Sequence, residues 1–268
     1  MFTIFIESLA GGMLAVFGTA RQEQVAWRFV RLVGVLVFAL AALAIAWEAR
    51  AHGLPVQNTE IAAAVCSAAL ALNAAAVVLA APLSWRLTAA FRVLCIMGGV
   101  AGIAAGLCLS LTRYSEVLRS PTADGLLIVS HLLGSILLGS VTVAWLLGHA
   151  YLTATKMTIA PLMHFSRVLS WAVAARAAFL VLSLGAAWLV GAEGGQAVSA
   201  VIYNSWLVTS LRILMGIVVL GVFAYMVAGC VRIRSTQSAT GILYFGSVFA
   251  YIGELAGLQL IQECGWPL

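Results

Sequence analysis

The sequence predicts an all-α integral membrane protein, a bundle of about eight transmembrane helices that fills residues 1–268 as a single domain. Hydrophobic residues make up 63% of the chain, and the mean hydropathy is +1.09. Only 9% of the residues are charged, whereas soluble domains carry about 25%. The sequence also divides into eight apolar runs, of which seven reach the length of about 20 residues that a helix needs to cross a bilayer.

The runs follow one another with short polar links between them. A barrel strand would need only about ten residues of strict alternation, and these runs are longer and continuous, so they predict helices. The first run is marginal in length, since it is the shortest. In order, the eight runs are 2–19, 27–48, 60–81, 87–111, 125–150, 167–190, 203–230 and 240–262.

The first run is expected to be a retained helix whose N-terminus lies outside. No basic residue precedes it, and Glu7 interrupts it. Arg21, Arg28 and Arg31 follow it, which is the reverse of the charge order in a cleaved signal peptide.

Turn and cap residues set the expected limits of the other runs. Ser238 or Thr240 is a natural N-cap for the eighth run, because short hydroxyl side chains accept hydrogen bonds from the first helical N–H groups. Prolines stand in or beside four links, at Pro55, Pro82, Pro121 and Pro161.

Small residues recur four apart in two runs and predict close helix packing in lipid. They are Gly98, Gly102 and Gly106 in the fourth run, and Ser140, Ala144 and Gly148 in the fifth. No internal repeat is recognisable in the sequence.

Loop charges orient the bundle. With eight spans, nine basic residues fall on one side and three on the other, which the positive-inside rule assigns to the cytoplasm and the outside respectively. Both termini are then periplasmic in a bacterial inner membrane, and the dominance of arginine over lysine fits a GC-rich bacterial genome. The inner set is Arg21, Arg28, Arg31, Arg86, Arg92, Lys156, Arg167, Arg232 and Arg234, and the outer set is Arg50, Arg113 and Arg119.

Several functional classes are disfavoured. The net charge of +5 lies in short loops without interleaved aromatic residues, so no nucleic acid partner is expected. The five cysteines form no CxxC pair, which argues against an iron–sulfur cluster held by this chain alone. Walker and HExxH motifs are absent from the sequence.

Polar residues at membrane depth are the candidate functional residues, because a charge there costs a few kcal/mol unless it faces the bundle interior or a cavity. Arg176 is expected near the midplane as a buried charge. The others belong to the periplasmic half: Glu7, His131, Arg212 and Glu254, with Tyr251 one turn from Glu254.

These residues support two interpretations. In the first, Arg–Glu pairs neutralise each other and fix the helix register. In the second, His131, Glu254, Arg212, Glu7 and Tyr251 line a quinone pocket, because a quinol needs hydrogen-bonding groups at its oxygens and a proton acceptor such as a histidine or a carboxylate.

The four histidines allow a third interpretation. His131 and His149 are eighteen residues apart, which is five helical turns, so they share one face about 27 Å apart. His52, in the loop after the second run, belongs to the outer side with His131, and His164 to the inner side with His149. Two histidines per side is what two stacked haem b groups would require as metal ligands.

The whole chain resembles the eight-helix membrane anchors of bacterial molybdopterin oxidoreductases, the dimethyl-sulfoxide-reductase-anchor and NrfD-like group. The resemblance is architectural and rests on size, eight spans, outside termini, short loops and outer-half polar residues such as His131, Arg212 and Glu254. It implies a subunit that exchanges electrons between quinone and a peripheral iron–sulfur or cytochrome partner.

The sequence therefore favours a membrane-embedded redox subunit that binds quinone or quinol in its periplasmic half and contacts membrane lipid and a peripheral electron-transfer subunit. A di-haem cytochrome b-like subunit is the first alternative. A transport, assembly or scaffold protein without redox activity is the second. Whether the chain is itself an enzyme stays open at this point.

Overall fold

A computed structural model of the chain is all-helical over the residues that it describes, which are 1–20, 25–84, 88–118, 121–153, 158–189, 199 and 205–268. Within these described ranges, seven helices are long and apolar enough to cross a membrane. Large apolar side chains such as Leu72, Leu79, Trp171 and Trp188 cover the outer surface, as expected where lipid surrounds a bundle.

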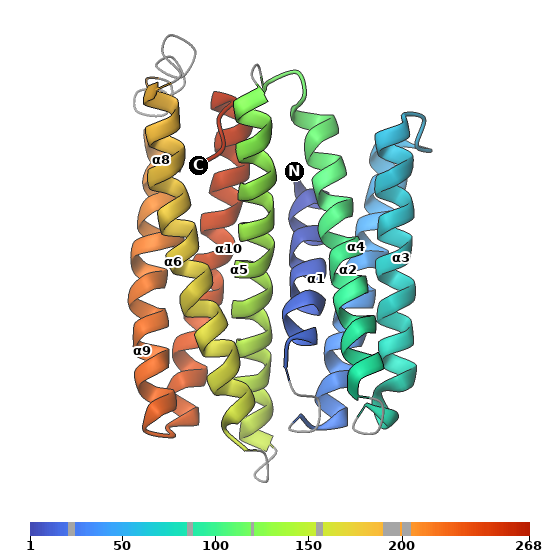
Figure 1. The fold of residues 1–268 in the computed structure, drawn as a ribbon, viewed down its shortest axis with the longest axis vertical. Helices are drawn as coiled ribbons and strands as arrows, with labels where there is room; N and C mark the ends of the chain where they lie inside the picture. Colours follow the sequence, from blue (N-terminus) through green and yellow to red (C-terminus); the bar gives the residue numbers. More distant parts are fainter. Residues whose placement is uncertain (21–24, 85–87, 119–120, 154–157, 190–198, 200–204) are drawn as a thin grey trace.

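The first four helices form a ring (Figure 1). They are α1 (Phe2–Gly18), α2 (Trp27–His52), α3 (Asn58–Ala80, followed by the short turn η2, Ala81–Leu83) and α4 (Thr88–Tyr114). Each packs on the next, and α4 returns to pack on α1.

The remaining helices form a second ring with the same order of contacts. They are α5 (Pro121–Thr153), α6 (Ala160–Leu189), one continuous rod made of α8 (Trp206–Ile213), the π-helical turn η3 (Leu214–Val219) and α9 (Leu220–Arg232), and finally α10 (Thr236–Cys264). Within this ring, α10 returns to pack on α5. The sequence showed no internal repeat, so this duplicated connectivity is visible only in the structure.

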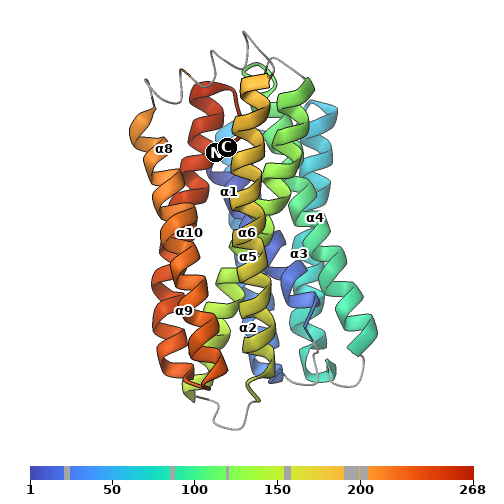
Figure 2. The ribbon, with the colours of Figure 1, turned by 60° about the vertical axis from the view of Figure 1, so that its left-hand side comes forward.

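The two rings, here called the N-terminal and C-terminal bundles, meet where α1 packs on α5 (Figures 1 and 2). Gly12 and Gly139 make this contact. A Cβ atom on Gly12 would lie 1.9 Å from the Ser135 carbonyl oxygen, and one on Gly139 would lie 2.1 Å from Gly12. The helix backbones therefore touch, and only glycine fits on either side.

On its other side, α1 is equally close to α4. A Cβ atom on Gly11 would lie 2.5 Å from the Ile103 nitrogen, and one on Gly99 would lie 2.3 Å from the Ala15 nitrogen. Of the 17 residues of α1, 15 are buried. The helix is enclosed by protein rather than lipid, which explains why a run of marginal length is sufficient here.

The small-residue stripes pack as the sequence predicted. A Cβ atom on Gly102 would meet Gly11, and one on Gly98 would meet Asn73 and Leu14. Ser140, Ala144 and Gly148 are all buried in α5.

Several predicted helix limits are wrong, and three of them bear on residues discussed above. The sixth helix begins at Ala160 rather than at residue 167, because Pro161 fits the first turn, where its missing N–H costs nothing. The eighth begins at Thr236 after Ser235, so neither Ser238 nor Thr240 is its N-cap. His52 is the last residue of α2 rather than a loop residue.

Both termini lie toward the same end of the bundle, here called the terminal end (Figures 1 and 2). The basic residues divide as the sequence predicted. Arg50 and Arg113 stand at the terminal end, whereas Arg28, Arg31, Arg92, Arg167, Arg232 and Arg234 lie toward the opposite end. The other charged loop residues in that prediction, Arg21, Arg86, Arg119 and Lys156, lie outside the described residues.

Candidate functional site

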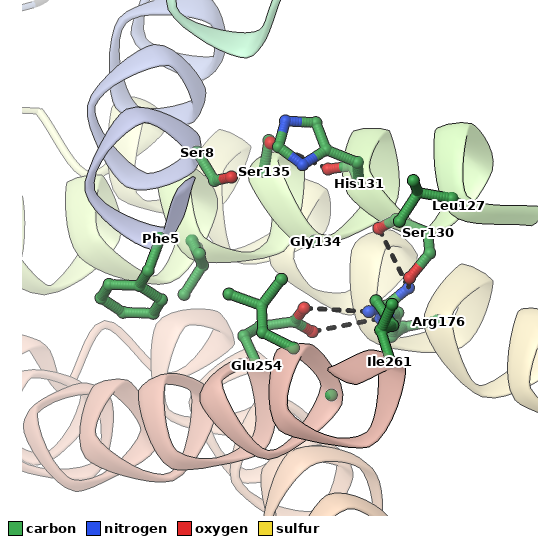
Figure 3. A pocket seen from close by; sticks show the side chains of 13 residues that line it. Phe5, Ser8, Leu127, Ser130, His131, Gly134, Ser135, Arg176, Glu254 and Ile261 are labelled. Carbon is green, nitrogen blue, oxygen red and sulfur yellow. Dashed lines mark hydrogen bonds and ion pairs between the residues drawn. The ribbon is translucent and has the colours of Figure 1, made fainter. Parts of the chain in front are cut away.

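Glu254 of α10 is the centre of a buried ion network (Figure 3). Arg176 of α6 donates to both of its carboxylate oxygens, from Nε at 3.1 Å and from Nη2 at 2.9 Å. Arg212 of α8 donates from Nη1 to Oε1 at 2.9 Å. Arg212 and Arg176 are only 1% and 2% exposed, so the Glu254 carboxylate offsets one of two positive charges that are buried at membrane depth.

Most of the remaining guanidinium donors bind neighbouring groups, although Arg212 Nη2 is buried without a partner among the described residues. Arg176 Nη1 donates to the carbonyl oxygen and hydroxyl of Ser130 on α5, at 3.0 and 2.9 Å. Arg212 donates to the Gly253 and Leu268 carbonyl oxygens, at 2.9 and 3.1 Å. The network therefore ties α5, α6, α8 and α10 together.

Glycines make room for these large polar groups. A Cβ atom on Gly134 of α5 would lie 2.6 Å from Glu254 Oε2, and one on Gly257 would lie 3.2 Å from Arg212 Cζ. The π-helical turn η3 begins two residues after Arg212, and Gly216 within it touches Gly253. Such turns are frequent where a helix carries a functional or buried polar group.

The last four residues fold back into the C-terminal bundle. Gly265 adopts the left-handed conformation that ends α10, with φ of 65°. Trp266 Nε1 donates to the Ser183 hydroxyl at 3.0 Å, and that hydroxyl donates to the Pro267 carbonyl oxygen. Apart from the helix-ending glycine, the sequence contained no signal for this turn.

His131 connects the two bundles. It is buried in α5, and its Nε2 lies 3.0 Å from the Ile103 carbonyl oxygen of α4; that nitrogen therefore carries the proton in this bond. The side chain fills the space beside Gly106, where a Cβ atom would lie 2.8 Å from the imidazole ring.

His131, Arg176 and Glu254 line one small cavity between the bundles (Figure 3). Its volume is about 20 Å³, which holds about one water molecule. Pockets for drug-sized ligands are about 300 Å³ or larger, so this cavity is too small for a quinone ring.

Tyr251 lies apart from that cavity. Its hydroxyl is 2.9 Å from the Thr142 hydroxyl of α5, and the Phe5 ring packs against it edge-on. The structure therefore brings Glu254, Arg212 and Arg176 together, with His131 at the same cavity, but leaves Tyr251 and Glu7 in other surroundings.

Glu7 lies on α1 in the N-terminal bundle. It is 0% exposed, yet neither carboxylate oxygen has a hydrogen-bond partner among the described residues. The Thr3 hydroxyl, one turn earlier on the same helix, is also buried without a partner in the described part of the chain.

A larger cavity of about 240 Å³ opens between α2 and α3 at the terminal end. Its walls are mainly small apolar side chains, including Ala44, Ala63 and Ala64, and a second space of about 440 Å³ adjoins it. The two spaces share the polar residues Glu48, His52 and Glu60. Sequence reasoning missed Glu48 and Glu60 as site residues, because both appeared to be ordinary loop-side charges.

Each of the two carboxylates at this cavity has a local partner. Glu48 Oε1 pairs with Arg113 of α4 at 2.5 Å, while its Oε2 is buried without a partner in the described structure. Glu60 accepts hydrogen bonds from the Val56 and Gln57 backbone, at 3.0 and 3.2 Å, and so caps α3.

The four histidines occupy different surroundings. His52 lines the α2–α3 cavity, and His149 is an exposed residue of α5. His164 Nε2 lies 2.8 Å from the Thr19 hydroxyl, near the end of α1. Within the described ranges, no three metal-ligating side chains gather at one place.

Comparisons with known proteins found no matching family model, curated protein or solved structure.

Proposed function

We propose that the chain is a membrane-embedded redox subunit that binds quinone or quinol in the half of the bundle next to its termini and passes electrons to or from a peripheral partner. The observation that carries this proposal is the α2–α3 cavity, which combines apolar walls with polar groups at its outer end. An isoprenoid quinone has the same division between an apolar body and polar oxygens.

Two groups in this cavity suit quinone chemistry. The His52 imidazole can donate to a quinone oxygen or accept a quinol proton. The unpartnered Oε2 of Glu48 is an acceptor for a quinol hydroxyl. The head group is therefore proposed to bind here rather than at Glu254, whose oxygens are already held by two arginines.

The architectural resemblance to molybdopterin-oxidoreductase anchors adds a partner to this proposal. It implies a peripheral iron–sulfur or cytochrome subunit, since the described residues of this chain group no metal ligands of their own. The loop charge asymmetry supports a periplasmic position for the quinone site in a bacterial inner membrane.

A second candidate is a membrane transport, assembly or scaffold protein without redox activity. The ion network favours it, because Arg176, Arg212 and Glu254 pair with one another and fix four helices. No contact of the four histidines favours the di-haem alternative: two of them bond to protein oxygens and His149 is exposed.

Quinone binding can be measured on the purified chain in potassium buffer. A short-tailed quinone titrated into the protein should quench tryptophan fluorescence, and Glu48→Gln or His52→Ala should weaken binding about tenfold, the effect of losing one hydrogen bond to the head group. Glu263→Gln and His149→Ala are matched controls, because both side chains are exposed away from the cavity. If all four variants show the same saturable quenching, quinone does not bind in this cavity. If the unsubstituted chain shows no saturable quenching, the non-redox candidate is favoured.

A further inference from the structure

Glu7 and Glu254 occupy related positions in the two bundles. Glu7 of α1 faces Gly106 of α4, and Glu254 of α10 faces Gly134 of α5. Each carboxylate thus lies where the first helix of its bundle packs on the last. Glu254 is neutralised by two arginines, whereas no ion pair in the described structure involves Glu7.

Glu7 has no cation paired with it among the described residues, and hydroxyl groups lie nearby. Ser67 of α3 lies close enough to interact with the Glu7 carboxylate, although neither Glu7 oxygen accepts a hydrogen bond from a described residue. Both Glu7 oxygens and Thr3 Oγ1 are buried without partners in the described residues. Because residues four apart share a helix face, these three oxygens lie on one side of α1.

A proton alone would leave this group incomplete. Protonation of Glu7 adds one O–H donor but leaves the three oxygens in place, none of them in a hydrogen-bonding position to another described residue. A small cation coordinated by the oxygens would neutralise the carboxylate and satisfy them together. Hard oxygen ligands select hard cations, and a single carboxylate matches a single positive charge.

An acidic route leads to this group from the terminal end. Thr3 and Ser67 line the inner part of the α2–α3 cavity. Glu48 and Glu60 line that cavity and the space outside it. Carboxylates along a cleft with apolar walls concentrate cations in it.

From this geometry we infer that Glu7, Thr3 and Ser67 form a binding site for one sodium ion, reached through the α2–α3 cavity. The site involves coordination only, with no electron transfer. It goes beyond the proposed quinone function and does not depend on it.

Sodium binding is tested on the full chain purified without quinone. Radioactive sodium should bind with a stoichiometry of one ion per chain. The melting temperature should be about 5 °C higher in sodium chloride than in potassium or choline chloride at equal ionic strength. Glu7→Gln should abolish both effects, and Thr3→Val should lower the affinity about tenfold or more while the protein stays folded.

Two variants serve as matched controls. Glu263→Gln removes an exposed carboxylate at the same end, and Thr142→Val removes a buried hydroxyl in the C-terminal bundle; both should bind sodium normally. Absence of bound sodium would overturn the inference, as would sodium stabilisation that persists in Glu7→Gln. A Glu7-dependent stabilisation by acid alone, equal in sodium and potassium, would show a protonated carboxyl and would also overturn it.

Discussion

At the scale of single residues, the two bundles differ in whether their buried carboxylate has hydrogen-bond partners. Glu254 accepts three hydrogen bonds from two guanidinium groups, and Glu7 accepts none from the described residues. The sequence identified both as buried charges, because a charge within an apolar run is conspicuous. The sequence could not show which residues pair with them, because pairing depends on which helices are neighbours and how each helix is rotated.

The Glu254 network predicts that a conservative substitution of Glu254 lowers the stability of the protein strongly. Glu254→Gln would leave Arg176 and Arg212 as buried, uncompensated charges, and breaking such a pair costs about 3 kcal/mol or more. The melting temperature of the purified chain should fall by roughly 10 °C. Glu263→Gln, at an exposed position of the same helix, should change it little; equal melting temperatures for the two variants would contradict the network.

Substitutions of His131 and of His149 should also have very different effects on stability. His131→Ala would remove the bond to the Ile103 carbonyl oxygen and leave that oxygen unsatisfied, at a cost of about 1–3 kcal/mol. His149 is exposed, so His149→Ala should leave stability unchanged. Denaturation curves of both variants provide the measurement, and an unchanged His131→Ala curve would show that the bond between the bundles contributes nothing.

At the scale of helices, sequence reasoning predicted the seven long apolar helices of the described residues but not all of their limits. Run length identified the helices, because the hydrocarbon thickness fixes how long they must be. Pro161 was taken as a link residue, and it stands instead in the first turn of α6. The turn at Gly265, after which the chain folds back into the bundle, was not predicted. The four residues involved are too few to show a sequence pattern.

The contact of α1 with α5 predicts unequal tolerance of glycine substitution. Gly12→Ala would place a Cβ atom 1.9 Å from the Ser135 carbonyl oxygen, and such overpacking costs about 3 kcal/mol. Gly185 of α6 has nothing within 4 Å of that position, so Gly185→Ala should be tolerated or slightly stabilising. Melting temperatures of the two variants should separate by roughly 10 °C; similar values would argue against direct backbone contact.

At the scale of the whole molecule, charge distribution predicted the separation of basic residues between the two ends, because alternate loops of a helical bundle lie on opposite sides. The two-bundle arrangement was not predicted. Its evidence is the order of helix contacts, and the two bundles fill equivalent positions with different residues, as Glu7–Gly106 and Gly134–Glu254 show. The order of helix contacts is therefore the same in the two bundles, although the residues at this contact differ.

The orientation of the bundle remains a prediction with a direct test. A reporter fused after Leu268 should be active only if it is a periplasmic reporter such as alkaline phosphatase. Within residues 153–160, an inserted reporter should be active only if it is of a type that works in the cytoplasm. The reverse pattern would invert the membrane position of both cavities and of the candidate sites.

The enclosure of α1 also constrains the order in which the protein can be made. α1 precedes its partners α4 and α5 in the sequence, and α5 ends only at Thr153. A nascent chain that ends before α5 therefore has no protein to cover the side of α1 that carries Gly12. α1 must wait at the insertion machinery or at the membrane surface until α5 has been synthesised. α1 thus completes its contacts only after helices that follow it in the sequence have been made.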